Sequence, residues 1–362
     1  MINTLLQLLP PIGICFLILF MMDRFKKYHI KFTGDPLNGG PQKIHTSPIP
    51  RIGGCGIFLG ILGASFFITS QNNLLINLFI LSTSPFFLIG LIEDLHSHIS
   101  VKNRFLALFF SATLVVLVAG FRIEDLGLKY ANALLATDLF AILFSAFAIT
   151  GLINSFNIID GLNGLCSFIT LIIISSIFCV SMVYSDIDLA GVCLISMGAI
   201  IGFIMWNYPA PKFFLGDNGA YLCGGLISLL SIALVSRNNQ VSPWFLFSLN
   251  IYPIFETIFS IYRRAFNKKS HPGKADRAHL HSLIFKRRLS VRRLFSLVNF
   301  HHSNSISSAL IFIFYFFWCI TCIAFHKNSM ALIFLSIIFI FLYLYIYKNI
   351  INFKSRRLVF LS

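Results

Sequence analysis

Charged residues are scarce in this chain, and acidic residues are the scarcest. Charged residues make up 11% of the 362 positions, with 13 Asp and Glu against 28 Lys and Arg. Ordinary soluble domains carry about 25% charged residues. Hydrophobic residues make up 57% of the chain, and the mean hydropathy is +0.83. A soluble protein of this composition could not cover its surface with polar groups. We therefore expect an all-α, polytopic integral membrane helical bundle.

Several signals of other protein classes are missing. The N-terminus has no basic segment or cleavage site, so residues 3–22 are predicted to be an uncleaved first span. The eight cysteines lie mostly in apolar runs. The pair Cys319 and Cys322 has no second pair of ligands, which favours small buried side chains over a metal site or a disulfide. No aromatic stacking platform accompanies the basic residues, so nucleic acid is not an expected partner. No internal repeat is visible, which argues mildly against a transporter built from two related halves.

Long apolar runs predict about eleven transmembrane helices in one integral membrane domain, residues 1–362. The predicted spans are 3–22, 52–70, 74–92, 105–121, 134–153, 164–184, 189–206, 219–235, 243–262, 305–325 and 330–347. Of the 28 Lys and Arg residues, 24 fall in the loops on one face and 4 on the other. This asymmetry predicts a periplasmic N-terminus and a cytoplasmic C-terminus. The basic run FKRRLSVRR at 285–293 is predicted to contact lipid headgroups.

Five short polar stretches fall on this basic, cytoplasmic face. They are KIHTSPIPRIGG at 43–54, the pair Glu93–Asp94, NSFNIIDGLNGL at 154–165, FFLGDNGA at 213–220 and DRAHLH at 276–281. Asn154, Asn157 and Asp160 have a spacing of three, which places them on one helical face. Asp217 lies in a glycine-rich stretch at a predicted helix N-terminus, where backbone N–H groups bind phosphate and a carboxylate binds Mg²⁺. Together these groups predict chemistry on a diphosphate carried to a lipid.

Each stretch alone also has a simpler explanation. The Glu93–Asp94 pair could be solvated, and the Asn and Asp run could cap a helix. His279 and His281 could lie in a surface loop. Glu256, inside the ninth predicted span, indicates either a functional group or an ion pair with Arg263 and Arg264. A transporter or lipid flippase remains an alternative for the whole chain, although its charged groups would spread toward mid-bilayer rather than cluster on one face.

Taken in this order, the five stretches resemble the polyprenyl-phosphate N-acetylhexosamine-1-phosphate transferase family, over residues 40–290. The forms PIPRIGG and AHLH are closer to the branch that initiates O-antigen or common-antigen synthesis than to the peptidoglycan branch, which stays the alternative. The resemblance implies transfer of a HexNAc-1-phosphate from a UDP-HexNAc, by default UDP-GlcNAc, to undecaprenyl phosphate. It also implies Mg²⁺, or Mn²⁺, as cofactor, an active site on the cytoplasmic face of the bacterial inner membrane, surrounding membrane lipids, and by analogy a homodimer.

The resemblance also implies roles for individual residues. The catalytic set is Glu93, Asp94, Asp160, His279 and His281; the substrate-binding set is Lys43, His45, Arg51, Asn154, Asn157, Asn163, Phe214 and Arg277; and the metal ligands are Asp217 and Asn157. The chain departs from the family pattern at Glu93 and Glu256, where Asp is usual, and at Ser282, where the branch often has another His. The expected mechanism is a single displacement, with a two-step route through a phospho-enzyme as the rival.

Overall fold

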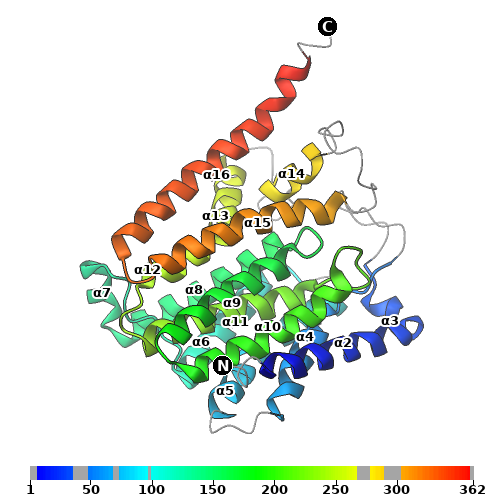
Figure 1. Cartoon of the computed structure of the whole chain (residues 1–362), viewed down its shortest axis with the longest axis horizontal. Helices are drawn as coiled ribbons and strands as arrows, with labels where there is room; N and C mark the ends of the chain where they lie inside the picture. The colour runs from blue at the N-terminus through cyan, green and yellow to red at the C-terminus, as the bar shows by residue number, and fades with distance from the viewer. Residues whose placement is uncertain are drawn as a thin grey trace.

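The structure is a computed structural model that describes residues 6–35, 48–67, 73–96, 99–266, 278–288 and 303–358. Those residues form helices and no β-strand, and one isolated bridge joins Gly34 to Pro50 (Figure 1). The expected all-α membrane fold is confirmed. The helices are η1 (Leu6–Leu8), α2 (Leu9–Arg24), α3 (Lys26–Thr33), α4 (Gly53–Ser65), α5 (Asn73–Leu95), α6 (Val101–Ala119), α7 (Lys129–Leu135), α8 (Asp138–Ile159), α9 (Leu165–Val183), α10 (Ile187–Asn207), α11 (Gly216–Arg237), α12 (Pro243–Leu249), α13 (Ile251–Phe266), α14 (Leu280–Arg288), α15 (Ser303–Ala324) and α16 (Ser329–Leu358).

Every predicted span corresponds to a helix, but two of them differ from a simple crossing. In the described part of the chain, nine helices are long and apolar enough to cross a membrane, and α12 with α13 makes a tenth that is bent by 67°. The second predicted span, 52–70, is the shorter helix α4 of 13 residues. Its glycine-rich sequence contributes little to helix stability and much to close packing.

The bend between α12 and α13 has a cause in the sequence. Pro253 has no N–H to donate to the carbonyl of Leu249, one turn earlier. Tyr315 of α15 donates its hydroxyl to that carbonyl instead, and Trp318 donates its indole N–H to the carbonyl of Ser248 at 2.8 Å. Two side chains from a neighbouring helix thus satisfy backbone groups that the bend releases, as a membrane interior requires.

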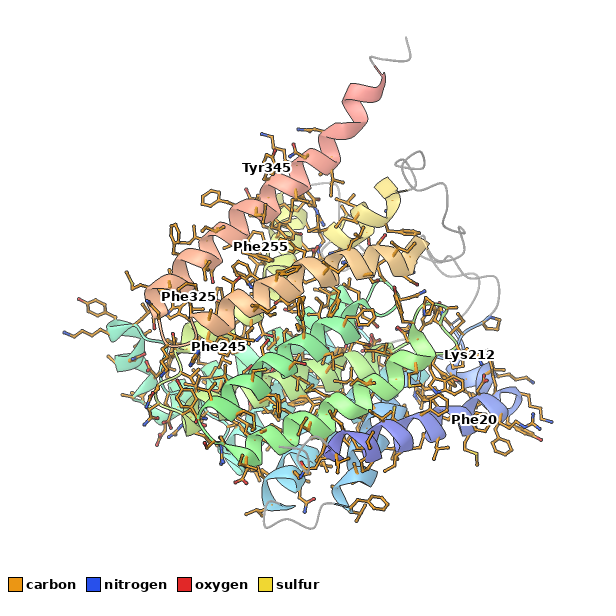
Figure 2. The ribbon with its side chains drawn as sticks, in the orientation of Figure 1. Phe20, Lys212, Phe245, Phe255, Phe325 and Tyr345 are labelled. Carbon is orange, nitrogen blue, oxygen red and sulfur yellow. The ribbon has the colours of Figure 1, made fainter. Side chains whose placement is uncertain are left out.

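Helix α11 forms the centre of the bundle, and α4, α5, α8 and α9 pack around it. Of its spanning window, 89% is buried, against 22% for α16 at the periphery. The outer helices α2, α6 and α16 expose large apolar side chains, as lipid-facing surfaces do (Figure 2). Cys319 and Cys322 are buried in α15, as expected of small packed residues.

Gly90 allows α5 to approach the first turn of α11 closely. A Cβ at Gly90 would lie 2.5 Å from the Cα of Asn218 and 2.5 Å from the carbonyl oxygen of Asp217. Both are backbone atoms of α11 and cannot rotate away. Backbone contacts of this kind are typical of small residues between membrane helices. Gly90 therefore sets the distance between the helix that carries Glu93–Asp94 and the helix that carries Asp217.

We expect Gly90→Ala to lower the melting temperature of the detergent-solubilised protein by several degrees, because overpacking costs about 1–3 kcal/mol. Gly151→Ala on α8 is the matched control, since a Cβ there would meet no atom within 4 Å. Removing a helical glycine at that open position is expected to be neutral or slightly stabilising. Equal melting temperatures for the two variants would contradict the close approach of α5 to α11.

Candidate active site

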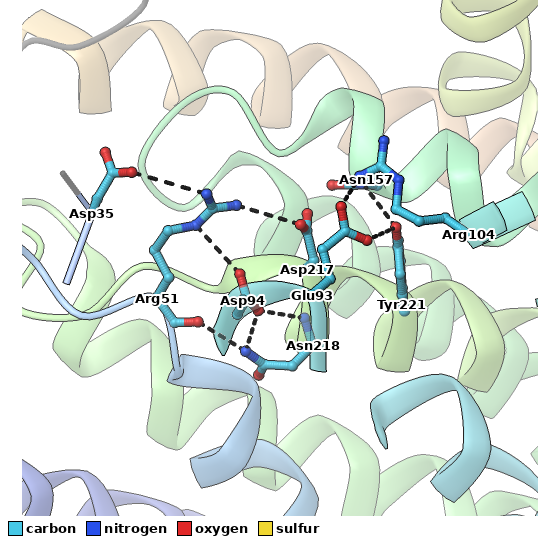
Figure 3. A network of polar contacts seen from close by, with 9 residues as sticks. All are labelled: Asp35, Arg51, Glu93, Asp94, Arg104, Asn157, Asp217, Asn218 and Tyr221. Carbon is cyan, nitrogen blue, oxygen red and sulfur yellow. Dashed lines mark hydrogen bonds and ion pairs between the residues drawn. The ribbon is translucent and has the colours of Figure 1, made fainter. Parts of the chain in front are cut away.

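Arg51 lies at the centre of a group of carboxylates where α4, α5 and α11 meet (Figure 3). Its Nε is 3.4 Å from an oxygen of Asp94, and its two terminal nitrogens are 3.6 Å from Asp217 and 3.9 Å from Asp35. The side chain of Arg51 keeps 39% of its surface exposed, whereas that of Asp94 is fully buried. One guanidinium, planar and rich in donors, thus holds together acids from three separate segments of the chain.

Asp94 also caps the N-terminus of α11. Its Oδ2 accepts hydrogen bonds from the backbone N–H of Asn218 at 2.8 Å and from the side-chain amide of Asn218 at 2.6 Å. The same amide donates to the carbonyl of Arg51 at 2.8 Å. Gly216, with a φ of 76°, opens the helix in the left-handed region that favours glycine. The N–H of Asn218, at the terminus expected to bind phosphate, therefore already binds Asp94.

Glu93 points away from its neighbour into a second polar group. Its Oε2 accepts a hydrogen bond from the hydroxyl of Tyr221 at 3.0 Å, and its Oε1 forms an ion pair with Arg104 (Figure 3). The amide of Asn157 donates to the same tyrosine hydroxyl at 3.5 Å. The repulsion between Glu93 and Asp94 is thus relieved by two different arginines, one for each carboxylate. Tyr221 joins this group to the Asn157 helix.

Asp160 follows the last residue of α8 and lies within the electrostatic reach of the same arginine. The three predicted residues do not all lie within one helix, because α8 ends at Ile159. Burial raises the pKa of Asp160 to about 7; Arg51 opposes this shift, while Asp217 and Asp94 add to it. Unless a further cation binds nearby, the ionised form of Asp160 therefore lowers the free energy of unfolding.

Asp160→Asn is expected to stabilise the metal-free protein at pH 8. A carboxyl whose pKa rises from 3.8 to about 7 on folding destabilises the folded state as the pH rises from about 4 to 7, and by a constant amount above that. The gain in the free energy of unfolding is at most about 4 kcal/mol at pH 8 and shrinks as the pH falls toward 4. Thermal melting in EDTA at pH 5 and pH 8 measures it. A melting temperature for the variant below that of the wild type at pH 8 would contradict the assignment.

The remaining residues predicted on the 154–165 and 213–220 stretches lie around this centre. Asn154 donates to the carbonyl of Thr150 in its own helix at 2.8 Å. Asn163 is buried and exchanges hydrogen bonds with Asn304 of α15, so in this structure it ties a loop to a helix. Phe214 bonds through its backbone to Pro50 at 2.9 Å and to Gly53 at 2.9 Å. Their predicted contacts with substrate stay predictions.

The histidine stretch packs against the loop that follows Asp160. The rings of His279 and His281 stack with centroids 5.4 Å apart, and both residues are buried. A Cβ at Gly161, the residue after Asp160, would lie 2.4 Å from Nε2 of His281. The loop after Asp160 and the start of α14 are therefore in direct contact. The predicted convergence of these two stretches agrees with this contact.

Glu256 does not form the ion pair considered for it with Arg263 or Arg264. Its buried carboxylate instead lies 2.9 Å from Nδ1 of His279. Three other predicted binding residues, Lys43, His45 and Arg277, lie outside the residues that the structure describes, as does the C-terminal part of the 285–293 run.

The centre offers oxygen ligands that suit Mg²⁺. In the described ranges, however, no three His, Cys, Asp or Glu side chains are close enough together to hold a metal ion by themselves. Mg²⁺ in phosphate-transfer sites needs only one or two carboxylates, because substrate phosphates and water complete its shell. Asp217 supplies a partly exposed carboxylate, and the buried Oδ1 of Asp94 has the ion pair with Arg51 at 3.4 Å but accepts no hydrogen bond. Asn157, whose side-chain nitrogen donates to Tyr221 at 3.5 Å, carries a further oxygen that could bind a cation.

Sequence reasoning missed several residues of the site. Tyr221 lies one turn after Asp217 on α11, so the helical period could have indicated it. Asn218 stood inside the GDNG motif but was not assigned a role. Arg104 lies ten residues after Asp94 in a stretch with no recognised motif. Tyr343, which donates to Glu256 at 2.9 Å, belongs to α16 and carries no motif that could have identified it.

Comparisons with known proteins identify the family. Residues 76–235 match the model of a protein family described as Glycosyl transferase family 4. An undecaprenyl-phosphate alpha-N-acetylglucosaminyl 1-phosphate transferase from Thermotoga maritima is 30% identical over 289 residues, which cover 78% of this chain and 84% of the relative. A protein of the same name from Escherichia coli K12 is 27% identical over 71% of each chain. A probable undecaprenyl-phosphate N-acetylglucosaminyl 1-phosphate transferase from Bacillus subtilis is 26% identical over 69% of this chain and 70% of its own. The chain belongs to the polyprenyl-phosphate N-acetylhexosamine-1-phosphate transferase family.

Proposed function

We propose that this protein transfers a HexNAc-1-phosphate from a UDP-HexNAc, UDP-GlcNAc by default, to undecaprenyl phosphate, releasing UMP. The observation that carries the proposal is the convergence of Asp94, Asp160 and Asp217 around Arg51, beside Glu93 and Arg104. A site of this charge suits a diphosphate and a divalent cation, and it occurs in a chain whose named relatives are undecaprenyl-phosphate transferases. The same evidence favours an enzyme over a transporter.

The proposed reaction is a single displacement. An oxygen of the lipid phosphate attacks the β-phosphorus of the UDP-sugar, a new P–O bond forms, and the bond to UMP breaks with its electron pair leaving on UMP. Phosphoryl transfer depends mainly on positioning and charge neutralisation. The second pKa of a phosphate monoester is about 6, so the acceptor is mostly ionised at pH 7 and needs orientation more than a general base.

In this proposal, the arginines of the site bind phosphate groups and the carboxylates bind cations. Arg51 and Arg104 are placed to attract the phosphate groups, and Glu93 and Asp94 hold these two cations in place. Asp217, with Asp160 and the amide of Asn157 nearby, would hold Mg²⁺ or Mn²⁺. When bound, that ion would neutralise charge on the diphosphate. The His279–His281 segment, in contact with the loop after Asp160, would approach the sugar diphosphate from the side of α14.

Localisation and pathway belong to the same proposal. Arg51, Asp94, Asp160 and Asp217 lie at the end of the bundle where α11 begins. We take this as the cytoplasmic end, because 24 of the 28 Lys and Arg residues fall in the loops predicted on that face. The N-terminus then faces the periplasm of a bacterial inner membrane. Initiation of O-antigen or a related envelope glycan is the pathway favoured by the PIPRIGG and AHLH forms. A homodimer is proposed by analogy with the family.

The test is an assay of UMP release. Purified protein would receive undecaprenyl phosphate, MgCl₂ and each of several donors: UDP-GlcNAc, UDP-GalNAc and a UDP-6-deoxy-HexNAc. Release of UMP together with a lipid-linked diphosphosugar supports the proposal, and no release with any donor overturns it. Exchange of labelled UMP into the UDP-sugar without lipid would favour the two-step route through a phospho-enzyme.

A further inference from the structure

The carboxylate of Glu256 is completely buried in α13, yet it lies outside the acidic centre around Arg51. It accepts three kinds of hydrogen bond. Nδ1 of His279 donates at 2.9 Å, the backbone N–H of Leu280 donates at 3.2 Å and 3.3 Å to its two oxygens, and the hydroxyl of Tyr343 donates at 2.9 Å. Buried carboxylates are stable only when donors satisfy them in this way. This carboxylate therefore has a defined position and three defined partners.

The contact with Glu256 fixes the chemical form of His279. A carboxylate has no hydrogen to donate, so Glu256 must accept the hydrogen bond from the imidazole. Nδ1 of His279 therefore carries a proton. The other ring nitrogen, Nε2, is then left to accept or donate a hydrogen bond elsewhere. Histidines that bind metals or substrates are commonly oriented by a carboxylate in this manner.

Helix α16 provides the third side of this arrangement, although it lies beyond residues 76–235, which match the family description. Tyr343 bonds to Glu256, and one turn later Tyr347 donates to the carbonyl of Ala278 at 3.1 Å. Arg263 of α13 donates to that same carbonyl at 2.6 Å. Figure 1 shows α16 along the outer edge of the bundle, next to α13 and α14. The residues just before α14 are thus held from two helices at once.

Contact with the reaction centre passes through the second histidine. The ring of His281 stacks on that of His279 at an angle of 1° between planes, and its Nε2 lies against Gly161. Gly161 follows Asp160 directly. A change in the position of His279 would therefore shift His281 against the loop that carries Asp160.

We propose that Glu256 and Tyr343 are positioning residues for the transfer reaction, which hold His279 in one tautomer and orientation so that His279 and His281 meet the sugar diphosphate. This inference rests on the proposed function for its catalytic part. Neither residue touches the reacting atoms, and both act through His279.

The test compares variants of the purified, full-length protein in the UMP-release assay. Glu256→Gln keeps the shape but loses the charge, and we expect kcat to fall about 10- to 100-fold, as when carboxylates that orient a histidine are removed. Tyr343→Phe removes one neutral hydrogen bond, and we expect kcat to fall about 3- to 10-fold. KM for both substrates should change less than about twofold, because the substrate-binding groups remain. Glu256→Asp should recover part of the activity lost in Glu256→Gln.

Tyr345→Phe is the matched control, because Tyr345 lies on the same helix with 67% of its surface exposed (Figure 2). Its kcat should equal that of the wild type. Wild-type kcat in folded Glu256→Gln and Tyr343→Phe would overturn the inference and leave the proposed function intact. If the wild type itself released no UMP, the proposed function would fail, and hydrogen–deuterium exchange would test the positioning alone. Glu256→Gln should then increase exchange in residues 278–288 and not in 216–237; unchanged exchange would overturn the inference.

Discussion

Asp217→Asn is expected to lower kcat at least about a thousandfold while the protein still folds. Asp217 lies in the first turn of the central helix α11, 3.6 Å from Arg51, and its side chain is 12% exposed. Asparagine has nearly the same shape but no charge to bind a divalent cation or to balance Arg51. Electrostatic groups aimed at the transferred phosphate usually make the largest single contribution to such reactions. Stability should hold or increase, because one of several neighbouring negative charges disappears.

The experiment needs both an activity and a stability measurement. UMP release gives kcat, and thermal melting shows that loss of activity is not loss of fold. Asp138→Asn is the control, because Asp138 begins α8 at the far end from Asp160 and its side chain is 82% exposed. Its kcat should stay within about twofold of wild type. Near-normal turnover by Asp217→Asn would refute the role assigned to Asp217.

The sequence predicted the spans well, because long apolar runs leave few alternatives in a membrane. It failed at α4 and at the bend between α12 and α13 for different reasons. The 52–70 run is apolar enough for a full span, but its helix ends at Ser65, which hydropathy does not indicate. Pro253 breaks the helix locally, but the bend is stabilised by Tyr315 and Trp318 of α15, which donate hydrogen bonds to the released carbonyls. Partners so distant in sequence cannot be read from a local pattern.

The sequence indicated which residues gather at the site, but not which of them contact one another. Arg51, Asp94, Asp160 and Asp217 were all selected, and the structure brings them together. Their individual contacts could not be inferred, because each pair joins segments more than a hundred residues apart or on different helices. Glu93 and Asp94 illustrate the limit: adjacent in the chain, they turn to Arg104 and Arg51 respectively. The part played by α16 depends on tertiary contacts of Tyr343 and Tyr347, for which spacing gives no signal.

Arg51→Ala is expected to impair both stability and catalysis, and the two effects can be separated. Without its guanidinium, the fully buried carboxylate of Asp94 has lost the arginine that balances its charge. Removing one partner of a buried ion pair costs about 3–5 kcal/mol, and the partial exposure of Arg51 reduces this to about 1–3 kcal/mol. We also expect kcat to fall at least about a hundredfold, since a cation placed to attract the substrate phosphates is lost. Thermal melting and UMP release measure the two losses.

The double variant Arg51→Ala/Asp94→Asn, compared with Asp94→Asn alone, distinguishes the two roles of Arg51, because Asp94 is itself a predicted catalytic residue. Asparagine at position 94 still offers an oxygen to the N–H of Asn218, so the cap of α11 persists while the unbalanced charge is gone. We therefore expect the double variant to recover most of the melting temperature lost in Arg51→Ala and to have a kcat well below that of Asp94→Asn alone. Arg122→Ala should leave kcat unchanged, because Arg122 pairs with Glu124 and Asp138, away from the site. A kcat in the double variant equal to that of Asp94→Asn alone would mean that Arg51 only stabilises the fold and has no part in binding the substrate phosphates.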